Sequence, residues 1–68
     1  MQKFKLNSEF IPLIQLLKAL NLVQTGGHAQ IVVSEGEVKV NGEVEYRKRL
    51  KVKAGDVVEF GGQKIVVE

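Results

Sequence analysis

The chain of 68 residues contains no cysteine, one histidine and one proline. Without cysteine there is no disulfide and no thiolate ligand, which fits a reducing cytosol. A metal site needs several ligands at set spacing, which the lone His28 cannot supply. No apolar run approaches the roughly 20 residues that span a bilayer, and the opening MQKFKLNSEF lacks the apolar core of a signal peptide. We therefore expect a cytoplasmic, soluble protein without metal or cofactor.

Residues suited to catalysis are also few. Nucleophilic catalysis needs a nucleophile, a base and an orienting group, and apart from Tyr46 the hydroxyl residues are Ser8, Thr25 and Ser34. Glycosidase-like chemistry needs two carboxylates across a cleft. Here the acidic residues fall mostly on predicted strand faces and turns, often beside a basic residue. We expect a protein that is not an enzyme and has no small-molecule substrate.

The composition is that of one small folded domain. The apolar content of 44% is ordinary for a globular protein. A domain of this size buries only about 60% of the surface that its unfolded chain exposes. The chain has no internal repeat, linker or low-complexity tract. We expect a single α+β domain over residues 1–68 with a modest core, which a partner could help to stabilise.

A short strand and a helix are predicted at the start of the chain. KFKL alternates polar and apolar residues, as a strand does. Ser8 can then cap a helix that ends near Asn21, with Pro12 in its first turn, where proline is tolerated. The apolar stripe of this helix consists of Phe10, Leu13, Ile14, Leu17 and Leu20.

A second helix is predicted in TGGHAQIVVSEG. Thr25 can cap its start, and Gly36 can adopt the left-handed conformation that ends it. Its buried stripe consists of Ala29, Val32 and Val33. Gly26 and Gly27 lower helix propensity at the start of this segment. They can either permit a tight turn between helices or leave the helix N-terminus open to an anion. The pattern matches neither GxGxxG nor GxxxxGK[ST].

Hairpins are predicted from Glu37 onward, where the apolar period changes to two. EVKV and EVEY flank Asn41-Gly42, the strongest short hairpin pattern. We expect Val38, Val40 and Val44 on one face, with Lys39 and Glu43 on the other or near the turn. Ala54-Gly55-Asp56 indicates a further turn. VVEF and KIVV flank Gly61-Gly62 as a second hairpin, so the helices are followed by four or five short strands.

The stretch YRKRLKVK, residues 46–53, carries five basic residues and no acidic one, whereas the other sixty residues have a net charge of −3. In an extended chain Arg47, Arg49, Lys51 and Lys53 face one side, and Leu50 and Val52 the other. This pattern favours a polyanion over simple protection of a sheet edge, because the arginine fork matches phosphate. Lys48 lies elsewhere or in an irregular turn. Tyr46 is compatible with stacking on an unpaired base and equally with a place at the edge of the core.

The order of these features resembles a known family. NLVQTGGHAQIVVSEGEVKVNGEVEYRKRLKVKAGDVVEF is similar to the RNA-binding domain named after small-subunit ribosomal protein S-four, with its alpha-L motif, and to its small stand-alone bacterial members. The resemblance covers about residues 13–60. It implies two packed helices against a small bent antiparallel sheet, with structured RNA on the second helix and the basic loop. Ribosomal or transfer RNA would be the first candidates, and a ribosomal or other protein partner is conceivable.

The chain departs from the family pattern at the second helix. Members often have Ser-Arg-Ser at its start and a further basic residue beyond, whereas Thr25-Gly26-Gly27 and Gln30 stand here. The Arg-Leu-Asp often found in the first helix is replaced by Pro12-Leu13-Ile14. The resemblance therefore implies that the loop supplies most of the positive charge. The predicted RNA-binding residues are Thr25, Gly26, Gly27, His28, Gln30, Arg47, Lys48, Arg49, Lys51 and Lys53.

Two other functions stay open from the residues alone. The basic stretch could dock an acidic surface of a partner protein, which makes a protein-interaction module the main alternative. From the residues alone, His28 is more readily a polar residue on an exposed first helical turn. DNA binding is less favoured, because the second predicted helix is short, apolar and nearly uncharged, unlike a helix that enters a major groove.

Overall fold

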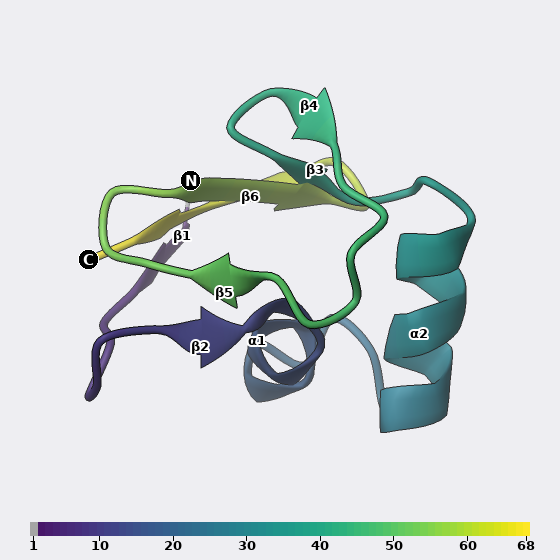
Figure 1. Cartoon of the computed structure of the whole chain (residues 1–68), viewed down its shortest axis with the longest axis horizontal. Coiled ribbons are helices and arrows are strands. Elements are labelled where there is room, and N and C mark those ends of the chain that lie inside the picture. Colours follow the sequence, from purple (N-terminus) through teal and green to yellow (C-terminus); the bar gives the residue numbers. More distant parts are fainter. Residues whose placement is uncertain (1) are drawn as a thin grey trace.

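The computed structural model describes residues 2–68, which form an α+β fold with two helices and two sheets. Figure 1 shows the larger sheet above both helices. The elements are β1 (Gln2–Phe4), β2 (Ile11–Pro12), α1 (Leu13–Ala19), α2 (Gly26–Ser34), β3 (Lys39–Val40), β4 (Glu43–Val44), β5 (Lys51–Val52), β6 (Val57–Phe60) and β7 (Gln63–Val67). The fold class predicted from the sequence is confirmed.

The larger sheet has the order β1-β7-β6-β3-β4, and β2 pairs with β5 in a separate small sheet. All pairs are antiparallel except β1 with β7, which run parallel with Gln2 opposite Ile65. The larger sheet is therefore mixed rather than purely antiparallel. Backbone bonds from Leu6 to Glu68 (2.7 Å) and from Glu68 to Phe4 (2.8 Å) tie the two ends of the described chain together.

Helix α1 begins later than the sequence predicts. The Ser8 hydroxyl bonds to the carbonyl of Phe10 (2.8 Å) instead of capping a helix. Pro12 is the N-cap residue and precedes the first turn, since it is paired with Lys51 in the β2–β5 sheet. The prediction of a Ser8 cap is wrong because this tertiary pairing holds residues 11–12 extended.

Both helices end as predicted. Asn21 and Gly36 have left-handed backbone, with φ of 58° and 75°. After α2, the Gly36 N–H bonds to Val33 and the Glu37 N–H to Val32, both at 3.1 Å. The same two-bond pattern follows α1, where Asn21 takes the place of glycine. This Schellman arrangement satisfies carbonyls that a helix end leaves unpaired.

The core lies between the helices and the sheets. Leu13, Leu17, Ala29, Val32 and Val33 are buried, as the helical spacing predicts. Leu16 is also fully buried, although it lies outside the predicted stripe. The strands, with Val38 just before β3, contribute a further set of buried residues: Ile11, Val38, Val52, Val58, Ile65 and Val67. Among the described residues no polar or charged side chain is buried.

The two hairpins occur where the sequence predicts them. Asn41 and Gly42 both have positive φ (53° and 85°), the turn geometry that matches the twist of paired strands. The predicted face of Val44 is wrong. Val44 pairs with Lys39, and Val40 with Glu43, so Val44 lies on the Lys39 face and is 41% exposed. A two-residue turn places Val40 and Val44 on opposite faces, since residues directly across a ladder share a face.

Candidate functional site

The basic stretch is mostly a loop. Only Lys51–Val52 is strand, and a turn closes over residues 47–50 through a bond from the Leu50 N–H to the Arg47 carbonyl (3.2 Å). The predicted extended run from Arg47 to Lys53 is therefore wrong in its first half. The strand alternation applies to Lys51, which is exposed, and Val52, which is fully buried.

Backbone bonds attach this loop to the start of α1. The N–H of Leu13 bonds to the carbonyl of Leu50 (2.9 Å), and the N–H of Ile14 to that of Lys48 (3.3 Å). These are among the donors that a helix N-terminus leaves unpaired, and Pro12 offers no side-chain cap. The loop carbonyls replace the missing cap. As a result, the backbone that carries the basic side chains is held beside α1.

A groove of about 540 Å³ lies between the start of α2, α1 and the basic loop. We call it the α1–α2 groove; its lining residues are Pro12, Ile14, Gln15, Lys18, Gly26, Gln30 and Arg49. Three of the predicted site residues therefore line this groove: Gly26 and Gln30 from α2, and Arg49 from a distant part of the chain. Gln15 and Lys18 are additions that the sequence reasoning missed. Their spacing of three residues on the polar side of a predicted helix was the available signal.

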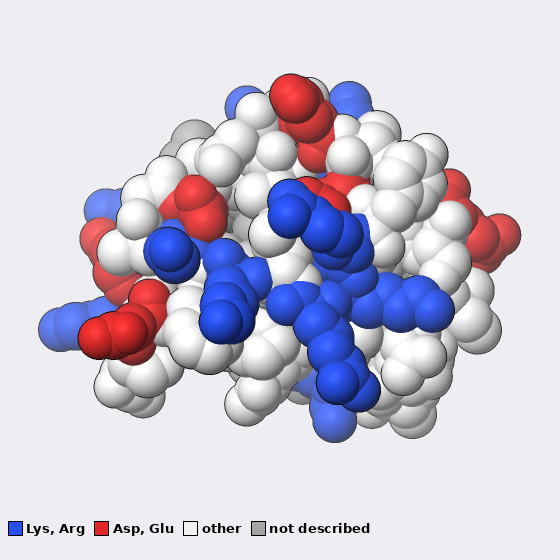
Figure 2. Space-filling model, in the orientation of Figure 1, with Lys and Arg blue, Asp and Glu red and all other residues white. Residues whose placement is uncertain are grey.

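A second hollow of about 450 Å³ adjoins β5 and is lined by Arg47, Arg49, Leu50, Lys51 and Lys53. Arg49 belongs to both depressions and so links them. Lys51 also places its Nζ 5.0 Å from the centre of the Phe10 ring, a cation–π contact that favours one position of its side chain. Figure 2 shows lysine and arginine side chains gathered at the middle of this face, with acidic residues mainly toward its margins.

Arg47 is less available than the sequence suggests. Its Nε and Nη2 lie 2.9 and 3.0 Å from the two carboxylate oxygens of Glu45, the one ion pair among residues 2–68. The Arg47 backbone N–H also bonds to Glu45 (2.9 Å). These bonds from Arg47 hold the pKa of Glu45 below its ordinary value. Glu45 therefore stays ionised at neutral pH and offsets part of the charge of the loop.

The remaining predicted residues line neither depression. Thr25 caps α2 as predicted, accepting a bond from the His28 N–H (3.0 Å). Thr25, Gly27 and His28 are exposed at the start of α2, beside Gly26. Lys48 is exposed and contributes its carbonyl to the α1 start. Their roles toward a ligand stay predictions.

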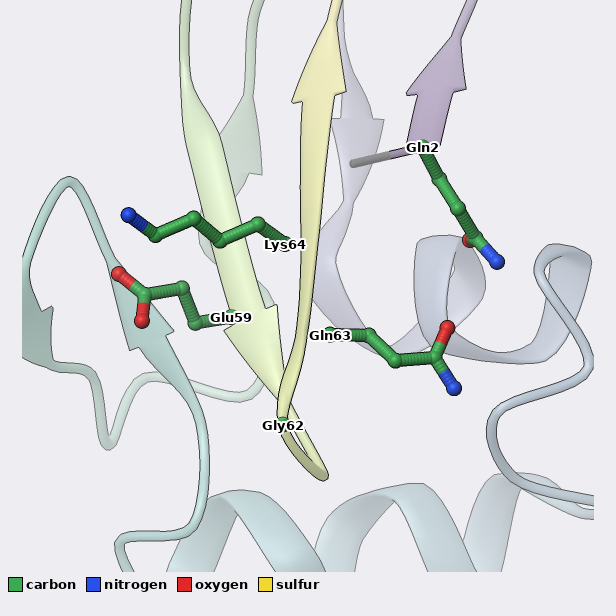
Figure 3. A pocket seen from close by; sticks show the side chains of 5 residues that line it. All are labelled: Gln2, Glu59, Gly62, Gln63 and Lys64. Atoms are coloured by element: carbon green, nitrogen blue, oxygen red, sulfur yellow. The ribbon is translucent and has the colours of Figure 1, made fainter.

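A larger hollow lies elsewhere. It measures about 620 Å³ and is lined by Gln2, Glu59, Gly62, Gln63 and Lys64. In Figure 3 the Glu59 and Lys64 side chains extend to one side of β7, and those of Gln2 and Gln63 to the other. Its two charges are opposite, so it does not concentrate positive charge. Residues 2–68 contain no cluster of three potential metal ligands and no helix long and apolar enough to cross a membrane.

The chain is similar in sequence and in structure to known proteins. A family model described as S4 domain matches residues 4–68. YbcJ of Escherichia coli and the "Probable ribosome maturation protein RlbA" of Bacillus subtilis are each 44% identical over 57 residues, which is 84% of this chain and 81% and 80% of theirs. The solution structure of YbcJ, reported to reveal an ALFAL motif involved in RNA binding, matches with a TM-score of 0.74 and 41% identity. That match covers 98% of this chain and 86% of the YbcJ chain. The chain described here therefore belongs to the S4-domain family.

Proposed function

We propose that this protein is a non-catalytic, single-domain RNA-binding protein that recognises structured RNA through phosphate and shape contacts. One observation carries the proposal: Arg49 joins the α1–α2 groove to the basic hollow beside β5. The two depressions then form one continuous surface. Its groove side presents the α2 backbone at Gly26 and the amide side chains of Gln15 and Gln30, and its other side presents the cations of the basic loop. YbcJ, reported with a motif involved in RNA binding, supports the same ligand class.

The two depressions suit different parts of an RNA backbone. Arg49, Lys51 and Lys53 would bind phosphates, with Lys18 closing the other side of the groove. Gln15 and Gln30 would bond to sugar hydroxyls or phosphate oxygens, and the backbone at Gly26 stays accessible because no side chain covers it. Double-stranded RNA hides its base edges in a deep, narrow major groove, so contacts to shape and backbone dominate its recognition.

Ribosomal RNA is the first candidate ligand. The relative from Bacillus subtilis is named as a probable ribosome maturation protein, and this chain is 44% identical to it over 57 residues. Thr25, Gly27, His28 and Lys48 complete the proposed interface as exposed neighbours of the groove and loop.

Charge reversal at one position tests the proposal. We expect Arg49→Glu to weaken binding of a fluorescein-labelled RNA hairpin by at least about tenfold, measured by anisotropy at low salt, since a lost phosphate contact to a charged group is worth roughly 1.5–3 kcal/mol. Lys64→Glu makes the same charge change at the hollow of Figure 3 and serves as the matched control. If both variants lose the same RNA affinity, or neither loses any, the two depressions are not the RNA-binding surface.

A further inference from the structure

Tyr46 is the most exposed large apolar or aromatic side chain among the described residues. It is 63% exposed, compared with 56% for Ile31 and 41% for Val44. A place at the edge of the core, one of the two readings the sequence left open, is therefore wrong. Tyr46 lies between β4 and the turn at residues 47–50, at the entrance to the basic loop.

The ring of Tyr46 lies against Gly36 at the end of α2. A Cβ at position 36 would come within 3.0 Å of the Tyr46 hydroxyl oxygen, 3.3 Å of Cε1 and 3.4 Å of Cζ. Glycine at position 36 therefore serves two purposes, since its φ of 75° ends the helix and its missing side chain admits the phenol. A bulkier residue there would displace the ring.

The backbone on both sides of Tyr46 is also held. The Glu45 N–H bonds to the Val38 carbonyl (2.9 Å), and the Arg47 N–H bonds to the Glu45 carboxylate (2.9 Å). The aromatic ring is thus presented from a constrained segment, exposed on its outer side. A preorganised ring loses less conformational freedom when it binds a ligand.

We propose that Tyr46 is a stacking platform for an unpaired nucleobase of the bound RNA. This inference rests on the proposed RNA-binding function and adds a contact class that phosphates and shape do not provide. Every base has a π face, so stacking on tyrosine requires no particular sequence. The cations that follow Tyr46 in the loop attract the phosphates of the same strand, which brings an unpaired base within reach of the ring. Stacking makes the protein favour RNA with a bulge or loop over a continuous duplex.

Two RNA probes and two substitutions test this inference. The probes are a short hairpin with one bulged adenosine and the same hairpin fully paired, both closed by the same non-nucleotide linker so that the bulge is the only unpaired base. Because base–aromatic stacking is worth roughly 1–3 kcal/mol per base, we expect Tyr46→Ala to weaken binding of the bulged hairpin by about 5- to 150-fold. Binding of the paired hairpin stays within about twofold, an effect under roughly 0.5 kcal/mol. Tyr46→Phe keeps the ring and retains the preference.

A spectroscopic measurement detects stacking directly. The chain contains no tryptophan, so Tyr46→Trp introduces one reporter that can be excited where RNA hardly absorbs. We expect the bulged hairpin to quench this fluorescence, and the paired hairpin, or a bulge with an abasic residue, to leave it nearly unchanged.

The outcomes separate this inference from the proposed function. If the wild type binds both hairpins but Tyr46→Ala affects neither, or both equally, the stacking platform is refuted while RNA binding stands. If the wild type binds neither hairpin at low salt, the proposed function fails, and this inference with it.

Discussion

Gly26 and Gly27 open α2 without any conformational need for glycine. Neither has a positive φ, in contrast to Gly36, Gly42, Gly55, Gly61 and Gly62. A Cβ at Gly26 would meet no atom within 4 Å, and one at Gly27 only the Thr25 hydroxyl at 3.8 Å. A tight turn therefore does not explain these glycines. Only Gly26 lines the α1–α2 groove, where its backbone is open to the proposed RNA contact.

Substituting each glycine separately distinguishes folding from binding. Alanine favours a helix over glycine by up to about 1 kcal/mol, so we expect both Gly26→Ala and Gly27→Ala to raise the free energy of unfolding in urea denaturation. Only Gly26→Ala places a methyl group in the groove. We expect Gly26→Ala to weaken RNA binding by about 3- to 10-fold, which corresponds to the free energy of one lost hydrogen bond. Stronger loss in Gly27→Ala than in Gly26→Ala would show that the groove is not the contact.

Among the elements, the loop from Glu45 to Leu50 differs most from its prediction. Period-two spacing predicted an extended strand, yet the segment turns, and its carbonyls accept hydrogen bonds from N–H groups at the start of α1. The Glu45 carboxylate is engaged by Arg47, which lowers its pKa. The ion pair stabilises the folded state fully at pH values above the ordinary glutamate pKa of 4.5. This stabilisation is lost as the pH falls through the lowered pKa of Glu45. We therefore expect acid to weaken the contact between Glu45 and Arg47.

Removing the Glu45 charge frees Arg47 at neutral pH. We expect Glu45→Gln to strengthen RNA binding at low salt and to steepen the slope of log K against log salt by up to about 1, because one more cation can neutralise a phosphate. Anisotropy titrations at several salt concentrations measure both quantities. Glu59→Gln removes the same charge at the hollow of Figure 3 and should leave the slope unchanged. An unchanged slope in Glu45→Gln would mean that Arg47 does not contact RNA.

For the whole molecule, the distribution of charge matters more than its total. The net charge is only +2, but the fold gathers five cations around two joined depressions: Lys18, Arg47, Arg49, Lys51 and Lys53. Figure 2 shows the resulting basic region at the middle of one face. A weakly charged protein can therefore present a strong local positive potential, which attracts a polyanion and depends on ionic strength.

The salt dependence of binding follows from this arrangement. With Arg47 engaged by Glu45, the cations that line the two depressions and form no ion pair are Lys18, Arg49, Lys51 and Lys53. Four phosphate contacts predict a slope of about −3 to −4 for log K against log salt. Anisotropy of the paired hairpin across a salt series measures it. A flat salt dependence would instead favour the protein-interaction module that docks an acidic partner.

The sequence by itself determined the parts that depend on neighbouring residues. Helical spacing identified the buried face of α2, Thr25 its cap, and Asn21 and Gly36 the two helix ends. The dipeptides Asn41-Gly42 and Gly61-Gly62 located both hairpins. These predictions hold because capping bonds and backbone preferences act over a few residues.

Only the tertiary structure decided how distant segments meet. The pairing of β2 with β5 set the late start of α1, and the bonds from Leu13 and Ile14 to the basic loop turned a predicted strand into a capping segment. The same contacts brought Gln15 and Lys18 to the groove with Gly26 and Arg49. Local propensity amounts to fractions of a kcal/mol per residue, so long-range hydrogen bonds and burial override it where the two compete.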